Sequence, residues 1–228
     1  MKVAIVLPAY NEERSLGGVI DGIRKALGKS RYDYQILVVN DCSSDATAKV
    51  AFQKKVILIN HTYNRGYGGA LLTGFRKANE HNADIIITMD ADGQHNPKDL
   101  KSLIGPIERD EADVVIGSRF LHGKTKFPFY RKLGISFFTA VTNILFGLNV
   151  SDCQSGLRAY SAEVIKDLKL TNHGMGISVE TLARIAKKDR RITEVPCICD
   201  YAKAAYSKDP ISHGMTLLKS LMMYYFEK

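Results

Sequence analysis

The chain has 228 residues, of which 45% are hydrophobic and 25% are charged, the composition of an ordinary globular protein that can bury a substantial core. Its 32 Lys and Arg residues exceed its 24 Asp and Glu residues, and the formal net charge of +8 favours an anionic partner such as a phosphate, a nucleic acid or an acidic membrane surface. The 4 cysteines have neither the spacing of a zinc knuckle nor a disulfide framework, which argues against both and indicates a reducing compartment, the cytoplasm.

The first half of the chain alternates short apolar runs with segments of helical periodicity. The strands predicted in chain order are residues 3–7, 35–39, 56–59, 85–89 and 114–116, and the helices predicted between them are residues 15–27, 45–52, 70–79 and 97–103. The strands are rich in Val and Ile, as strands buried on both faces tend to be. This alternation predicts an α/β fold with a mostly parallel, doubly wound sheet and helices on both faces.

The polar clusters of this half follow the predicted strands. Residues 8–12, 40–45, 64–69 and 90–94 come directly after the first four strands. Because parallel α/β sheets bind ligands at the carboxyl ends of their strands, we expect these clusters to meet at one edge of the sheet and to form the site.

The second half has a different pattern. We predict a long apolar helix over residues 129–149, a polar turn at 151–158, a helix at 178–188, a strand at 192–199 and a final apolar helix at 215–226. The start of the chain does not have the pattern of a signal peptide, and no apolar run reaches the ~20 residues that span a bilayer. We therefore expect a single domain over residues 1–228, soluble or at a membrane surface.

The segment DADGQ at residues 90–94 ends an apolar strand with two carboxylates, Asp90 and Asp92. Like charges at this spacing repel each other, and a hard divalent cation, Mg²⁺ or Mn²⁺, removes the conflict because it takes oxygen ligands. Gln94 offers one more neutral oxygen. A helix-capping turn before Pro97 would explain the same residues without a metal.

Two other loops have features of a nucleotide site. Asp41 opens the loop after the second strand, where a carboxylate can accept hydrogen bonds from ribose hydroxyls or a base, although an Asx turn has the same sequence. The segment NRGYGG at residues 64–69 stands before a helix and could cradle a phosphate. It matches neither the dinucleotide fingerprint nor the P-loop, so a tight turn is an equal alternative.

Basic residues surround the apolar helix of the second half. Arg119, Arg131, Lys132 and Arg158 could contact an anionic acceptor, because arginine favours bidentate phosphate contacts, or they could form a solvated face. Basic and aromatic residues form no interleaved patch, so a nucleic-acid partner is not expected.

Six segments, taken in order, resemble the family 2 glycosyltransferases with the GT-A fold, in particular the branch that makes dolichyl-phosphate and polyprenyl-phosphate sugars. They are PAYNE at residues 8–12, NDCSSD at 40–45, NRGYG at 64–68, DADGQH at 90–95, GSR at 117–119 and DCQSG at 152–156. The resemblance runs from residue 3 to about residue 158, with a weaker tail to residue 208. It implies that residues 1–117 bind a nucleotide sugar and that residues 118–228 bind the acceptor.

The function that the resemblance implies is the metal-dependent transfer of a hexose from a nucleotide sugar to dolichyl or polyprenyl phosphate. GDP-mannose is the favoured donor and UDP-glucose is the other that fits. A phosphate monoester is already an anion near neutral pH, with a second pKa of about 6, so it needs alignment and charge neutralisation but no general base. In-line attack by this acceptor predicts inversion at the anomeric carbon.

The resemblance and the residue patterns together imply the roles of individual residues. The expected donor-binding residues are Pro8, Tyr10, Glu12, Asp41, Asp90, Lys203 and Lys208. The expected ligands of Mg²⁺ or Mn²⁺ are Asp90, Asp92 and Gln94. The acceptor is expected to contact Arg119, Arg131, Ser136, Gln154 and Arg158, and the expected catalytic residues are Asp92, Arg119 and Arg131. Ala202 stands about where the family has an arginine, which leaves the contact to the donor's phosphates open.

Other functions remain as alternatives. A glycosyltransferase that uses a saccharide hydroxyl would need a general base, for which Asp152 is the candidate. A nucleotidyltransferase and a catalytically silent nucleotide-binding module are the others.

The apolar helix at residues 129–149 has basic flanks and could rest on a membrane surface, because a prenyl chain lies in a bilayer. An ordinary core helix or a dimer interface is the alternative. The expected location is the cytoplasm, with peripheral contact at the inner face of the cell membrane. A homo-oligomer or a partner membrane subunit is also compatible with this helix.

Overall fold

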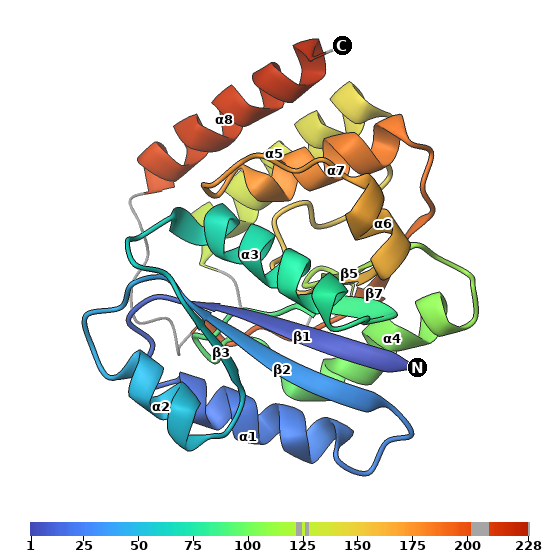
Figure 1. The fold of residues 1–228 in the computed structure, drawn as a ribbon. Coiled ribbons are helices and arrows are strands. Elements are labelled where there is room, and N and C mark those ends of the chain that lie inside the picture. The colour runs from blue at the N-terminus through green and yellow to red at the C-terminus, as the bar shows by residue number, and fades with distance from the viewer. Residues whose placement is uncertain (122–124, 126–127, 202–209, 228) are drawn as a thin grey trace.

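The computed structural model describes residues 1–121, 125, 128–201 and 210–227, and it is built around a seven-stranded sheet of order β3-β2-β1-β4-β6-β5-β7 (Figure 1). The strands are β1 (Lys2–Ala9), β2 (Asp33–Asn40), β3 (Ile57–Asn60), β4 (Ile85–Thr88), β5 (Val114–Ser118), β6 (Arg158–Ser161) and β7 (Ile192–Pro196). Neighbouring strands pair in parallel, except that β6 runs antiparallel to both β4 and β5. The predicted mostly parallel sheet is confirmed.

Helices cover both faces of the sheet (Figure 1). One face packs against α1 (Leu16–Leu27), α2 (Thr47–Gln53) and α4 (Leu100–Glu108), which follows the short 3₁₀ helix η1 (Pro97–Asp99). The other face packs against α3 (Gly66–Glu80), α6 (Ala162–Asp167) and α7 (Ile177–Lys187). On this second side, α5 (Phe129–Phe146) and α8 (Pro210–Phe226) pack on α7 around a smaller apolar cluster.

The sequence accounts for the central strands and for two helix starts. Because helices lie on both faces, β4 and β5 are buried along their whole length and read as continuous apolar runs. Asp45 accepts a hydrogen bond from the backbone N–H of Thr47 at 2.9 Å, and Asn96 accepts one from Lys98 at 3.1 Å, just before Pro97. Asn96 is therefore the N-cap of η1, whereas Asp45 lies one position before Ala46, the N-cap residue of α2.

The second half differs from the prediction at several points. Strand β6 was not predicted because its sequence, RAYS, lacks the apolar run that marks the equally short β4, and helix α6, with 6 residues, is too short to show a periodicity. Helix α5 ends at Phe146, before the predicted end at residue 149, because Gly147 takes a left-handed φ of 66° that closes the helix. Strand β7 likewise ends at Pro196, before residue 199. Within the described residues, no helix has the length and apolar character to cross a membrane.

Candidate functional site

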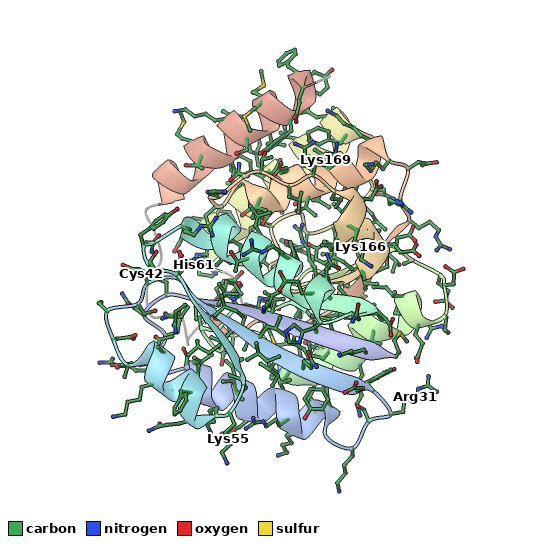
Figure 2. The ribbon with its side chains drawn as sticks, viewed as in Figure 1. Arg31, Cys42, Lys55, His61, Lys166 and Lys169 are labelled. Atoms are coloured by element: carbon green, nitrogen blue, oxygen red, sulfur yellow. The ribbon has the colours of Figure 1, made fainter. Side chains whose placement is uncertain are left out.

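A cavity of about 570 Å³ opens at the carboxyl ends of β1, β2 and β4. Residues from each of the four polar clusters line it, as do several residues of the second half: Pro8, Tyr10, Glu12, Asp41, Asn64, Tyr67, Asp90, Asp92, Gln94, Arg119, Arg131 and Gln154. Figure 2 shows Cys42 and His61, which follow β2 and β3, at this edge of the sheet, and Arg31, which precedes β2, at the opposite edge. The predicted convergence of the loops is confirmed.

The carboxylate of Asp90 is held by two residues from different parts of the chain. Its Oδ1 accepts a hydrogen bond from the hydroxyl of Tyr67 at 3.0 Å, and its Oδ2 lies 3.3 Å from Nε2 of His95. Burial alone would raise the pKa of Asp90, but the hydrogen bond and charge of His95, followed by the hydrogen bond of Tyr67, lower it below its usual value. Asp90 is therefore ionised at neutral pH.

The neighbouring Asp92 is in the opposite electrostatic situation. Its burial, followed by the negative charge of Asp90, raises the pKa of Asp92, and hydrogen bonds from Gln94 offset only part of this effect. Those hydrogen bonds come from the backbone N–H of Gln94 at 2.9 Å and from its Nε2 at 2.6 Å. The two carboxylates therefore repel each other, and a cation between them would remove the cost of ionising both.

The carboxylates of Asp90 and Asp92 fit Mg²⁺ or Mn²⁺, whereas the third predicted ligand, Gln94, does not present its oxygen to the same place. The side chain of Gln94 directs its nitrogen at Asp92, and its Oε1 accepts a hydrogen bond from Sγ of Cys199 at 3.5 Å, so the amide must rotate to offer oxygen to an ion. Among the described residues, no three His, Cys, Asp or Glu side chains form a ready-made metal site. A Mg²⁺ ion held by two carboxylates completes its shell with water and substrate phosphates, so Asp90 and Asp92 suffice on the protein side.

Asp41 organises the loop at residues 64–69. Its side chain is 4% exposed, and its two oxygens accept hydrogen bonds from the backbone N–H groups of Arg65 and Gly66, each at 2.8 Å. The Nδ1 of His61, 5% exposed, lies 2.6 Å from Oδ1 of Asp41. A carboxylate has about four acceptor positions, so the predicted contact with a ribose is compatible with these bonds and stays a prediction.

The geometry of residues 64–69 is that of the tight turn, and a contact of this loop with a phosphate stays a prediction. The backbone N–H groups of Arg65 and Gly66 are used by Asp41, and that of Gly69 donates to the carbonyl of His173 at 3.1 Å. Gly66 has a φ of +81°, as the turn requires. The functional contribution of this loop is the hydroxyl of Tyr67 on Asp90, which sequence reasoning missed.

Arg119 and Asp152 form a buried ion pair. The Nε and Nη2 atoms of Arg119 donate to the two carboxylate oxygens of Asp152 at 2.6 and 2.7 Å, and Asp152 is 0% exposed. Asp152 is also absent from the lining of the described cavity. The alternative in which Asp152 acts as a general base is therefore wrong, because a base must reach the proton that it abstracts.

Tyr201 lies between the two predicted acceptor arginines, and it was not among the residues predicted from the sequence. Its hydroxyl accepts a hydrogen bond from Nη1 of Arg119 at 2.7 Å, and the guanidinium of Arg131 lies 5.2 Å from the centroid of its ring. All three residues line the cavity.

Three other predicted acceptor residues have different outcomes. Arg158 is 2% exposed and donates to the backbone carbonyls of Ser155, Ser178 and Cys153. The expected contact of Arg158 with the acceptor substrate is therefore wrong, and its role is structural. Ser136 is exposed on α5 and is not among the residues that line the cavity, whereas Gln154 is. The predicted donor contacts of Lys203 and Lys208 lie outside the described residues.

Comparison with known proteins agrees with this geometry. The model of glycosyl transferase family 2 matches residues 4–169. The UDP-N-acetylglucosamine–dolichyl-phosphate N-acetylglucosaminyltransferase of Methanococcus voltae is 34% identical over 98% of this chain and 93% of its own length. The undecaprenyl-phosphate mannosyltransferase of Micrococcus luteus is 34% identical over 86% of this chain and 82% of its own length.

A solved structure shares the fold. The glucosyl-3-phosphoglycerate synthase of Mycobacterium tuberculosis, in complex with Mn²⁺, uridine diphosphate and glucosyl-3-phosphoglycerate, superposes with a TM-score of 0.74. The match is 20% identical and covers 98% of this chain and 79% of that chain. The same synthase has also been solved with Mg²⁺ and uridine diphosphate.

Proposed function

The chain belongs to glycosyl transferase family 2 and has the GT-A fold, and on this premise we propose that it transfers a hexose from a nucleotide sugar to a polyprenyl phosphate such as dolichyl phosphate. The observation that carries the proposal is that one cavity is lined by three kinds of side chain: an acidic group, a basic group and an apolar group. GDP-mannose is the favoured donor and a UDP-sugar is the second candidate.

The acidic group suits a nucleoside diphosphate with its metal. It consists of Glu12, Asp90 and Asp92, of which Asp90 and Asp92 would hold Mg²⁺ or Mn²⁺. When bound, the ion supplies neutralisation of the charge that develops on the leaving diphosphate. Burial, together with the charges of Asp92 and Asp90, raises the pKa of Glu12, which agrees with a concentration of negative charge that needs a cation.

The basic group suits a phosphate monoester. It consists of Arg119 and Arg131, which line the same cavity, and guanidinium groups bind phosphate oxygens in defined geometry. An ionised phosphate is itself the nucleophile, so the burial of Asp152 against Arg119 costs this reaction nothing. Attack in line with the leaving diphosphate inverts the configuration of the anomeric carbon.

The apolar group suits a prenyl chain. It consists of Ile135 and Phe138 of α5 and Met175, which line the same cavity. Outside it, α5 and α8 expose large apolar side chains, which are Phe129, Leu133, Phe137, Ile144, Met215, Leu218, Met222, Met223 and Phe226. Exposed apolar surface of this extent on two packed helices marks an interaction site. These side chains support peripheral contact with the inner face of the cell membrane, where the prenyl chain of the acceptor would lie.

One assay tests the proposal. The purified protein is incubated with polyprenyl phosphate, Mn²⁺ and, in separate reactions, radiolabelled GDP-mannose, UDP-glucose and UDP-N-acetylglucosamine. We expect one label to enter the organic phase, and no transfer with Asp92→Asn or without the acceptor. Transfer of label only to water-soluble saccharides would contradict the proposal. Flotation of the purified chain with lipid vesicles separates direct membrane contact from a membrane subunit or a second copy that covers the same helices.

A further inference from the structure

Tyr201 contacts two arginines that come from different elements. Arg119 follows β5, Arg131 lies in the first turn of α5, and Tyr201 follows β7. The Tyr201 hydroxyl accepts from Arg119 Nη1 at 2.7 Å, and its ring lies under Arg131 with 5.2 Å between the guanidinium carbon and the centroid. One aromatic side chain thus uses its polar tip for one arginine and its face for the other.

The orientation of Arg119 is fixed on two sides. Asp152 holds the edge formed by Nε and Nη2, and Tyr201 holds Nη1. Asp152 also neutralises the charge of Arg119. The net positive charge of this part of the cavity therefore comes from Arg131. The negative face of the tyrosine ring attracts Arg131 and keeps it in the cavity.

A tyrosine can do this without cancelling positive charge. Burial raises the pKa of Tyr201 to about 12, so its phenol is neutral near pH 7. A carboxylate at the same place would also accept from Arg119, but it would cancel the positive charge that Arg131 brings to the site.

We infer that Tyr201 is a positioning residue that joins Arg119 and Arg131 into one binding site for the phosphate of the acceptor. The inference deepens the proposed function and rests on it, because it assumes that the acceptor is a phosphate monoester. It assigns Arg119 and Arg131 to the acceptor's phosphate and not to the diphosphate of the donor.

The test compares three variants with the wild-type protein. Tyr201→Phe removes the hydroxyl and keeps the ring, and Tyr201→Leu removes both. Tyr32→Phe is the matched control, because it removes a hydroxyl that donates to Glu108 at 3.0 Å next to the start of β2, at the opposite edge of the sheet. The measurements are KM for farnesyl phosphate in detergent, kcat, the Kd of the nucleotide-sugar donor and Tm.

For Tyr201→Phe we expect the acceptor KM to rise about tenfold, the effect of losing one hydrogen bond to a charged group. For Tyr201→Leu we expect a further rise of about threefold or more from the lost contact with Arg131. The donor Kd should change less than twofold in both, and Tyr32→Phe should keep the wild-type acceptor KM.

Two results would overturn the inference. The first is an unchanged acceptor KM in Tyr201→Leu, and the second is a rise in donor Kd as large as the rise in acceptor KM, which would place the donor's phosphates at this site. Failure of the proposed function is a separate outcome, because the wild-type protein would then transfer no label to farnesyl phosphate at all.

Discussion

Gly156 offers the sharpest test of the metal site, because it lies against the carboxylate of Asp90. A Cβ atom at position 156 would lie 2.6 Å from Oδ2 and 3.0 Å from Oδ1 of Asp90. A carbon and an oxygen in contact stand about 3.3 Å apart, so Gly156→Ala requires a shift of roughly 0.7 Å. The turn is not free to retreat, since the carbonyl of Gly156 accepts a hydrogen bond from Thr88 Oγ1 at 2.8 Å. The carboxylate must therefore move.

A displacement of about 1 Å in a catalytic group can cost about 100-fold in rate. For Gly156→Ala we therefore expect kcat/KM to fall roughly 30-fold, or about 2 kcal/mol, and the Kd of Mn²⁺ to rise in parallel. The φ of Gly156 is outside the left-handed region, so alanine introduces no backbone strain of that kind and the contact alone is tested. Steady-state kinetics with labelled donor and calorimetry with Mn²⁺ measure the two effects.

The matched control is Gly18→Ala, since a Cβ at Gly18 on α1 would meet no atom within 4 Å. This variant should keep wild-type kinetics and gain slightly in Tm, because alanine favours a helix. If Gly156→Ala kept kcat/KM and the Kd of Mn²⁺ within twofold of wild type, the position of Asp90 would not govern metal binding and the reasoning would be refuted.

Three other predictions concern the metal and the membrane. Because the pKa of Asp92 is raised in the folded protein, its ionisation costs stability as pH rises through that pKa. Asp92→Asn should therefore raise the metal-free Tm at pH 7 and abolish the Tm shift caused by Mn²⁺. For the same reason, wild-type Mn²⁺ affinity measured by calorimetry should fall as pH is lowered, and should begin to fall at a higher pH than for an ordinary aspartate. An unchanged Tm response to Mn²⁺ in this variant would exclude Asp92 as a ligand. Tyr67→Phe removes a hydrogen bond to Asp90 and should raise the Kd of Mn²⁺ about tenfold in the same calorimetry, whereas an unchanged Kd would show that Tyr67 does not position the ligand. Leu133→Glu combined with Phe137→Glu should abolish flotation with anionic vesicles and leave transfer to farnesyl phosphate in detergent within about threefold; persistent flotation would assign membrane contact to another surface.

The sequence predicts the donor half well because its signals are local. The predicted strand at residues 3–7 is β1 (Lys2–Ala9), and the predicted strand at 35–39 is β2 (Asp33–Asn40). Their apolar runs, buried on both faces, need no knowledge of distant contacts. Since parallel strands bring their carboxyl ends to one edge, Asp41 and Asp90 could also be expected in one cavity, where the structure has them.

The acceptor half could not be predicted to the same degree, because its residues take their roles from distant partners. Arg158 in a polar segment has the same sequence signal whether it faces a ligand or, as here, three backbone carbonyls. Asp152 reads as a candidate base until Arg119, 33 positions away, is seen to occupy both of its oxygens. The contact of Tyr201 with Arg119 joins residues 82 positions apart and has no local signature.

Strand β6 explains why the two halves cannot be separated physically. It lies between β4 and β5, with Thr88 paired to Arg158 and Ile116 also paired to Arg158, so the sheet would be divided without it. The same antiparallel strand brings the turn before it to the end of β4, where Gly156 meets Asp90. The carboxylate of Asp90, in the first half of the chain, therefore lies against a turn of the second half, and we expect a change in the turn at residues 152–156 to alter the affinity of the proposed metal site.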